Sequence, residues 1–589
     1  MHDVMHDVMH DVPKAGKPRR GFGHRGGLTA GIKAGLQREP RRGRIATSSQ
    51  QSHTAGSSFR RNWLAWRSAS SLRIRFGRIA LAVLLAAPLG PSWADDEVAS
   101  AAAAVASEVA QKQKLRALFP DPTASLQATP PVIPQLEIDG DSSGTIATFQ
   151  PNGSTPTASN AFFQNLGSNG RTCFTCHQPQ DGWSLSAQDA QARFNSDPTD
   201  PLFRRVDGAT CPSADISTLA AQRAAYSLLT NKGLIRIGLP MQSTMEFQIL
   251  DVRDPYGCDN NPITGLTGSK SGILSFYRRP LPSTNLGFLS TIMWDGRESD
   301  LFQQSVDATL GHAQGNPPGP SPNQQQQIVT FEGCTTANSA VPCANTPKGA
   351  GIFTAQIHDN SAGPLTAHSA NGGPVTLATN VTSFYIGIND PLGLNPNGAA
   401  FNPVIFDLYN SWADLNGQGG PAAARRAVAR GQHIFNSVPI NITGVGGLND
   451  VLNQPSIIGF CGTCHDTPAA GNHSVKAPLN IGIANAGPNS PPALDISGLP
   501  VFTLWCTSGP LAGKTFQVTD VGRAMISGKC ADIGKVKGPI LRGLAARPPY
   551  FHNGSAATLS DVVEFYDQRF GIGFTAAQKA DLVAFLNAL

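Results

Sequence analysis

The 589-residue sequence lacks, over most of its length, the basic charge that its formal net charge of +5 suggests. Residues 1–94 hold 16 Lys and Arg against 4 Asp and Glu, and removing this surplus of 12 leaves −7 for residues 95–589. A long apolar run is also missing, because the clearest one, residues 79–87, is too short to cross a bilayer comfortably. The sequence therefore gives no support for nucleic-acid binding, and it leaves a membrane anchor only as an alternative.

An export signal is predicted at residues 71–94. Three arginines, Arg73, Arg75 and Arg78, precede the apolar run, and residues 92–94 (Ser-Trp-Ala) offer small side chains at the cleavage positions. Residues 1–70 are then either a disordered extension or the result of a start codon placed too early. The signal predicts a periplasmic protein that is attached to the membrane only if the signal stays uncleaved.

Cysteine is scarce, with 10 residues, and four of the ten lie in two copies of Cys-x-x-Cys-His. In an exported protein this pentapeptide attaches a c-type haem: the two thiols form thioethers and the histidine supplies an axial nitrogen. A redox dithiol or half of a zinc site explains a bare Cys-x-x-Cys, but explains less well a motif that occurs twice with a histidine directly after it. We expect two covalently bound haem c groups, on Cys173, Cys176 and His177, and on Cys461, Cys464 and His465.

Six cysteines remain, an even number that suggests three disulfides in an oxidising compartment. Sequential pairing closes three local excursions of the chain. The expected pairs are Cys211–Cys258, Cys334–Cys343 and Cys506–Cys530, with buried free thiols as the alternative.

The chain divides into two haem regions preceded by a lead-in. Residues 95–135 read as an Ala-rich helix and a Pro-rich linker, residues 136–415 as an N-terminal haem c domain with insertions, and residues 416–589 as a C-terminal haem c domain. We expect a mostly α protein of two cytochrome c-like haem domains with β-hairpin and loop insertions.

Smaller segments carry local expectations. Residues 234–252 alternate like strands, residues 315–347 are rich in Pro, Gln, Asn and Gly and predict a surface loop, and β-branched residues at 375–388 predict a hairpin arm. Residues 422–435 predict a helix, and capping boxes predict helix starts at Thr558 and Thr575.

Two further patches carry a resemblance. They are Ile292-Met-Trp-Asp-Gly-Arg-Glu298 and the segment from Gly538 to Tyr566, which includes Tyr550-Phe-His552. With paired haem motifs in this order, the chain resembles the bacterial di-haem cytochrome c peroxidase family, which includes MauG-type enzymes. The resemblance implies that Trp294 connects the two haems electronically and that Gln304 lies in the distal pocket of the first haem.

The chain departs from that family on the distal side of the first haem. The family's acid/base glutamate should fall near position 314, where this chain has Gln314, and we take His312 as the candidate acid/base because an imidazole can transfer protons near neutral pH. The sequence has no histidine between His177 and His312 that could close the first iron. Three methionines remain as alternative ligands: Met241, Met245 and Met293.

A second departure concerns the other haem. The resemblance places the second axial ligand at Tyr566, where many family members have methionine and MauG-type proteins have tyrosine, with Met525 as the rival. It also implies a calcium ion held by the backbone carbonyls of Arg547 and Pro549 and by a side chain at position 279. That side chain is Arg279, and a cation in place of a ligand puts calcium in doubt.

These expectations support three hypotheses. The first is a periplasmic di-haem oxidoreductase that reduces hydrogen peroxide with electrons from a small cytochrome or other periplasmic donor protein, or uses a high-valent di-haem state to oxidise a substrate. The second is a dioxygen-dependent di-haem oxygenase of the rubber-oxygenase type. The third is a non-catalytic electron-transfer cytochrome.

Overall fold

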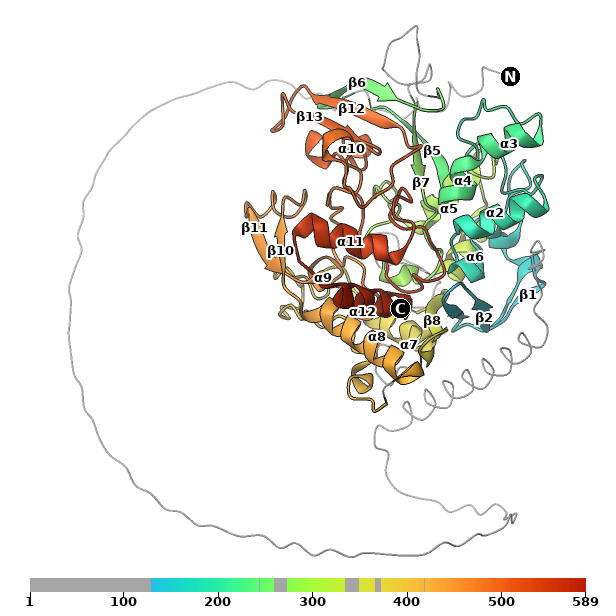
Figure 1. The fold of residues 1–589 in the computed structure, drawn as a ribbon. Helices are drawn as coiled ribbons and strands as arrows, with labels where there is room; N and C mark the ends of the chain where they lie inside the picture. Colours follow the sequence, from blue (N-terminus) through green and yellow to red (C-terminus); the bar gives the residue numbers. More distant parts are fainter. Residues whose placement is uncertain (1–128, 243, 259–272, 334–348, 366–371, 418) are drawn as a thin grey trace, which may run out of the picture. The chain divides into compact units, whose positions relative to one another are not determined.

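Figure 1 shows the chain as a computed structural model that describes residues 129–242, 244–258, 273–333, 349–365, 372–417 and 419–589. All of them belong to one compact unit, residues 89–589. The predicted extension, the export signal and most of the lead-in lie outside the described residues. Within those residues, no helix is long and apolar enough to span a membrane.

Helices occur along the whole described chain. The α-helices are α2 Ala187–Ser196, α3 Leu219–Ala225, α4 Ser227–Lys232, α5 Leu301–Gly311, α6 Pro322–Glu332, α7 Pro374–Asn380, α8 Gly420–Ser437, α9 Cys461–Cys464, α10 Ala524–Ser527, α11 Leu559–Phe570 and α12 Ala576–Asn587. The 3₁₀ turns are η1 Thr157–Ser159, η2 Ala161–Phe163, η3 Cys173–Thr175, η4 Pro179–Asp181, η5 Leu286–Phe288, η6 Val381–Ser383, η7 Asn410–Trp412, η8 Gly487–Asn489 and η9 Cys530–Asp532.

The strands form small antiparallel sheets. One sheet has the order β2 (Leu136–Gly140), β3 (Gly144–Phe149), β8 (Phe353–Asp359) and β9 (Gly363–Pro364). Two-stranded pairs join β1 (Val132–Ile133) to β4 (Thr155–Pro156), β5 (Ile235–Pro240) to β7 (Ile273–Arg278), and β10 (Ile440–Thr443) to β11 (Ser456–Gly459). The last sheet places β12 (Val501–Cys506) between β13 (Thr515–Val518) and β6 (Phe247–Arg253).

This last sheet joins segments that are far apart in the sequence. Phe502 pairs with Val252 of β6 on one side and with Val518 of β13 on the other. Apolar side chains from both halves of the chain, including Phe276 and Phe502, then fill one core beneath it. The insertions of the two haem regions therefore share a core.

The structure confirms the strands, the helix and the capping boxes that the sequence predicts. The predicted strands are present as β5 and β6, and the helix at 422–435 is confirmed as α8. Both capping boxes are confirmed, because the Thr558 and Thr575 hydroxyls accept hydrogen bonds from the third backbone N–H of α11 and α12.

Two expectations were wrong. The predicted hairpin arm at 375–388 begins with helix α7, in which Pro374 occupies the first turn and Leu377 is buried in the core. The predicted surface loop contains helix α6, whose capping box at Ser321 and Gln324 outweighs the polar composition of the segment. Each of these segments therefore carries a helix-start signal, Pro374 in one and Ser321 in the other.

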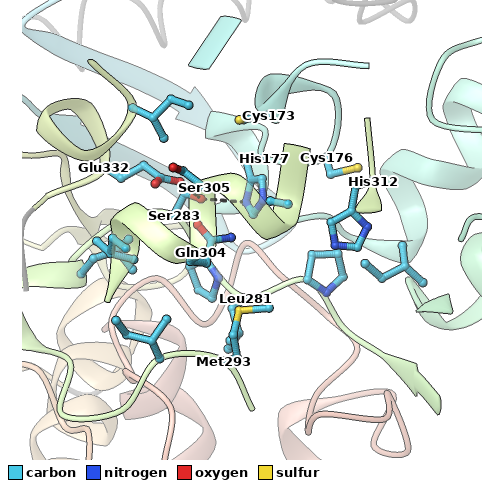
Figure 2. A pocket seen from close by; sticks show the side chains of 18 of the residues that line it. Cys173, Cys176, His177, Leu281, Ser283, Met293, Gln304, Ser305, His312 and Glu332 are labelled. Carbon is cyan, nitrogen blue, oxygen red and sulfur yellow. Dashed lines mark hydrogen bonds between the residues drawn. The ribbon is translucent and has the colours of Figure 1, made fainter. Parts of the chain in front are cut away.

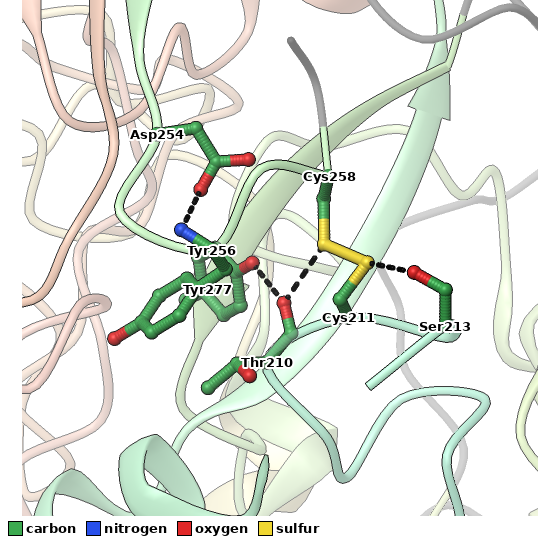
Figure 3. The surroundings of a disulfide bond; sticks show 7 residues. All are labelled: Thr210, Cys211, Ser213, Asp254, Tyr256, Cys258 and Tyr277. Atoms are coloured by element: carbon green, nitrogen blue, oxygen red, sulfur yellow. Dashed lines mark hydrogen bonds between the residues drawn. A yellow bond between two sulfur atoms is a disulfide. The ribbon is translucent and has the colours of Figure 1, made fainter. Parts of the chain in front are cut away.

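Two of the three predicted disulfides are confirmed. Cys211 is bonded to Cys258, and Cys506 at the end of β12 is bonded to Cys530. Figure 3 shows the first bridge beside Tyr277, whose hydroxyl donates a hydrogen bond to the carbonyl oxygen of Thr210. The predicted pair Cys334–Cys343 lies outside the described residues.

The C-terminal helices build a core around α8. Figure 1 shows α8, α11 and α12 together, and α8 packs on α12. Gly431 allows this contact, because a Cβ at that position would lie 2.0 Å from the carbonyl oxygen of Asp581. Phe406, Phe435 and Phe585 belong to the core at this contact.

Candidate functional site

The first Cys-x-x-Cys-His motif lines a large pocket. Cys173 opens the 3₁₀ turn η3, which is fixed by a hydrogen bond from the Thr172 N–H to the Thr175 hydroxyl at 3.0 Å. Cys173 and Cys176 are not joined to each other, and both face the pocket with His177. The space not filled by atoms, including its opening to solvent, is about 1450 Å³.

The second motif lines an even larger pocket of about 1630 Å³. Cys461 and Cys464 lie on the single-turn helix α9, which is held by a 2.9 Å hydrogen bond from the Phe460 N–H to the Thr463 hydroxyl. Both thiols are free and line the pocket with His465.

Both histidines are oriented in the same way. Nδ1 of His177 donates to the carbonyl oxygen of Trp183 at 2.9 Å, and Nδ1 of His465 donates to that of Gly471 at 2.7 Å. Each acceptor lies six residues after its histidine. Burial lowers the pKa of each imidazole to about 4, so both rings are neutral with Nε2 unprotonated. This is the tautomer that a metal-ligating histidine requires.

The residues of each pocket fit a haem c. Two thiols stand ready for thioether formation, a neutral Nε2 can ligate iron, and the walls are largely apolar. Each pocket thus has the residues that a covalently bound haem c requires.

The predicted catalytic residues of the first pocket come together. Figure 2 shows Gln304 and His312 in the same pocket as His177, delivered by helix α5 and its C-terminal end. Met293 also lines this pocket, whereas Met241 and Met245 pack against the core under β12.

His312 is held by a buried carboxylate that sequence reasoning missed. Its Nδ1 lies 2.6 Å from Oδ2 of Asp207, which also forms an ion pair with Arg171. Burial alone would raise the pKa of Asp207, but Arg171 and His312 hold it below its usual value. Asp207 therefore stays ionised and accepts a hydrogen bond from Nδ1 of His312, whose side chain is 34% exposed to solvent.

A second missed carboxylate lies behind His177. The Ser283 hydroxyl is 3.1 Å from His177 Nδ1 and donates to Oε1 of Glu332 at 2.7 Å (Figure 2). Burial raises the pKa of Glu332 to about 7. A single Glu at the end of a Gln-rich helix gave no sequence signal for this position.

Trp294 lines both pockets. Its Nε1 donates to the carbonyl oxygen of Arg279 at 2.9 Å, and its ring meets the His552 ring edge to face at a centroid distance of 6.1 Å. The next residue, Asp295, is buried and paired with Arg278 at 2.5 Å. The indole is thus fixed in the wall that the two pockets share.

Tyr566 lines the second pocket together with His465. Burial, reinforced by the two nearby thiols Cys464 and Cys461, raises the pKa of its hydroxyl above the ordinary value, and that hydroxyl has no hydrogen-bond partner among the described residues. The rival ligand Met525 is fully buried in the core under β12 and does not line this pocket.

The expected calcium site does not fit a cation. One guanidinium nitrogen of Arg279 donates to the carbonyl oxygen of Arg547 at 3.0 Å, and this is one of the two carbonyls that the resemblance assigns to calcium. In the described part of the chain, no cluster of His, Cys, Asp or Glu forms an alternative metal site. We derive no role for calcium.

Comparisons with known proteins point to one group. No family model matches the chain. A cytochrome-c peroxidase of Denitromonas iodatirespirans, IdrP2, is 36% identical over 140 residues, which are 22% of this chain and 36% of that protein. Cytochrome c551 peroxidase of Nitrosomonas europaea is 28% identical over 151 residues, 24% of this chain and 36% of that protein.

The chain thus spans about a third of the length of these relatives. A crystal structure of a MauG-like protein associated with microbial copper homeostasis aligns over 73% of this chain and 87% of that one, at 16% identity and a TM-score of 0.30. The sequence matches show that part of this chain is similar to cytochrome c peroxidases.

Proposed function

We propose that the chain is a periplasmic di-haem c-type oxidoreductase with two haem domains, which reduces hydrogen peroxide with electrons from a cytochrome or other periplasmic donor. The kinship with cytochrome c peroxidases and the two motif-lined pockets support this function. The two disulfides in the described chain fit an oxidising compartment.

The first pocket has the groups that peroxide reduction needs. Reduction of one hydrogen peroxide to two waters consumes two electrons and two protons. The bound haem supplies the iron redox centre. His312 accepts a proton from peroxide at Nε2 and returns it to the departing oxygen, while Asp207 keeps the proton on Nδ1. Gln304 is placed to donate a hydrogen bond in the same pocket.

The position of Trp294 in both pocket walls is the observation on which the proposal depends. With a haem held by His177 and another by His465, Trp294 would lie between two redox centres, and its aromatic ring would offer a route for electrons between them. In the second pocket, Tyr566 is the residue we propose as the ligand opposite His465, because its free hydroxyl shares the pocket with that histidine.

Replacing Trp294 tests this function. Trp294→Leu should lower peroxide turnover by about 100-fold or more, about 3 kcal/mol in barrier height, because electrons no longer cross the wall. Trp505→Leu is the control, since Trp505 is exposed on β12 and lines neither pocket. The readout is steady-state reduction of peroxide by a reduced cytochrome, with haem content checked by absorption.

Undiminished turnover of Trp294→Leu would contradict the proposal. A stable dioxygen complex in the isolated protein, with no reaction toward peroxide, would instead favour the oxygenase hypothesis.

A further inference from the structure

Three cations lie in or next to the wall between the two pockets. Arg279 and Lys537 line both pockets, and Arg547 lines the second. All three side chains are buried. A buried cation is costly unless it is paired, so the partners of these three groups are informative.

Their hydrogen-bond partners in the described chain are neutral. Arg547 donates to the carbonyl oxygens of Ile540 at 2.6 Å and Arg542 at 3.0 Å, and Lys537 donates to that of Thr291 at 3.2 Å. No carboxylate of the described residues forms an ion pair with any of the three. Arg279 and Arg547 therefore bring positive charge to the wall that no ion pair neutralises, whereas burial lowers the pKa of Lys537 to about 7 and leaves it only partly charged at neutral pH.

One carboxylate, Asp181, acts on Arg279 from beyond ion-pair distance. Burial, followed by the repulsion of Asp189, raises the pKa of Asp181 to about 8, so this carboxyl is mostly uncharged at neutral pH. It does not neutralise the wall.

Arg279 occupies the centre of this arrangement. Its backbone N–H donates to the carbonyl oxygen of His552 at 2.7 Å, its own carbonyl accepts from Trp294, and its guanidinium donates to the carbonyl of Arg547. It thus connects the tryptophan patch to the Tyr-Phe-His segment. Room for the guanidinium depends on Gly233, where a Cβ would lie 1.9 Å from Nη1.

We propose that Arg279 supplies, as a covalent part of the chain, the positive charge between the two haems that a calcium ion would otherwise provide, so that the holoprotein needs no divalent cation there. The inference rests on the proposed di-haem function, because it concerns the charge in the wall between two bound haems.

The chemistry of the site favours an arginine over a metal. A guanidinium stays protonated at any physiological pH and donates several hydrogen bonds from one plane, so it can serve carbonyls and carboxylates together. Its donation to Arg547 also takes up a carbonyl that a cation would need, and its charge repels a second cation at that distance.

Metal dependence of the holoprotein tests the inference. We would treat the purified wild-type holoprotein with EGTA, then with excess calcium, and record its absorption and EPR spectra and its calcium content. The expected result is no stoichiometric calcium and superimposable spectra in both conditions. Stoichiometric calcium, or spectra that change in EGTA and recover with calcium, would overturn the inference without any variant.

Variants sharpen the test. Arg279→Asn removes the charge and adds a carbonyl ligand, so its spectra in EGTA should differ from wild type and move back when calcium is added, whereas Arg279→Lys should stay insensitive to EGTA. Arg542→Asn is the control, because Arg542 is also buried, donates to backbone carbonyls such as that of Gly372 at 2.8 Å, and lines neither pocket. Wild-type spectra for Arg279→Asn in EGTA would overturn the inference.

The spectra are read without peroxide or an electron donor. A holoprotein that ignores EGTA but fails to turn over peroxide would therefore refute the proposed function and leave this inference standing.

Discussion

At the scale of single residues, the chemistry is decided by groups that face the haem motifs from distant parts of the chain. Asp207 fixes His312 across 105 positions of sequence, and Ser283 reaches His177 across 106. Asp207 and Glu332 are both buried, but compensating cations lower the pKa of Asp207, whereas Glu332 has a single hydroxyl partner and its pKa rises to about 7. Burial raises the pKa of a carboxyl group where no nearby cation stabilises the ionised form.

Glu332 predicts a pH dependence of stability. Its pKa in the folded protein is about 7 against an ordinary value of 4.5, so the folded state binds its proton more tightly and loses stability as the pH rises between these values. Glu332→Gln carries no titrating group. The difference in free energy of unfolding between variant and wild type should therefore move in favour of the variant by up to about 3 kcal/mol between pH 5 and pH 8.

Urea denaturation of both holoproteins at the two pH values measures this difference. Parallel changes in the two proteins would show that Glu332 does not titrate in this range.

Tyr566 gives a second prediction at this scale. Tyr566→Phe keeps the ring packed beside Phe551 and Phe570 but removes the oxygen. If the hydroxyl ligates the second iron, the EPR signal of that haem should change its g-values or spin state, while the signal of the first haem should stay as it is. Unchanged EPR signals from both haems would assign Tyr566 a packing role only.

At the scale of elements, the helices around the second motif depend on close approach. The helix α8 lies so near α12 that Gly431 faces both the Asp581 carbonyl and the Cβ of Phe585, at 2.0 and 2.6 Å from a hypothetical Cβ. Phe435, four residues later on α8, belongs to the same core and lines the second pocket. The distance between α8 and α12 therefore affects the position of a residue that lines the second pocket.

Gly431→Ala should accordingly destabilise the protein by about 1–3 kcal/mol, because the added methyl group overpacks the helix crossing. Gly311→Ala is the control: it lies in α5 with open space around its Cβ position, and alanine there should be neutral or stabilising by up to about 1 kcal/mol. Thermal unfolding followed by circular dichroism measures both. Equal stabilities of the two variants would contradict the proposed close contact.

The sequence predicted helices and disulfides better than the contacts between distant residues. Regular periodicity and caps at Thr558 and Thr575 identified the C-terminal helices, and cysteine order identified two disulfides. The hydrogen bonds from His177 and His465 to the carbonyls of Trp183 and Gly471 could not be predicted, because every residue type offers a backbone carbonyl. The role of Asp207 could not be predicted, because only the fold brings this residue next to His312.

At the scale of the whole molecule, the two regions that carry the haem motifs share a sheet and a hydrophobic core. β6, from the first half of the chain, pairs with β12 from the second, and the core beneath that sheet draws on both halves. Ala469 and Ala470, just after the second haem motif, pack in turn against the core that surrounds Leu286 and Phe353 of the first half. The boundary expected near residue 415 therefore separates haem motifs rather than hydrophobic cores.

The shared wall has a consequence for how such a protein can change. Seven residues border both pockets: Arg279, Pro280, Leu281, Pro282, Trp294, Lys537 and Pro539. A substitution at any of them alters the walls of two pockets at once, so neither site can be adjusted there without disturbing the other. Libraries that aim to retune one haem alone should therefore spare this wall and vary positions such as Gln304 or Tyr566, which border a single pocket.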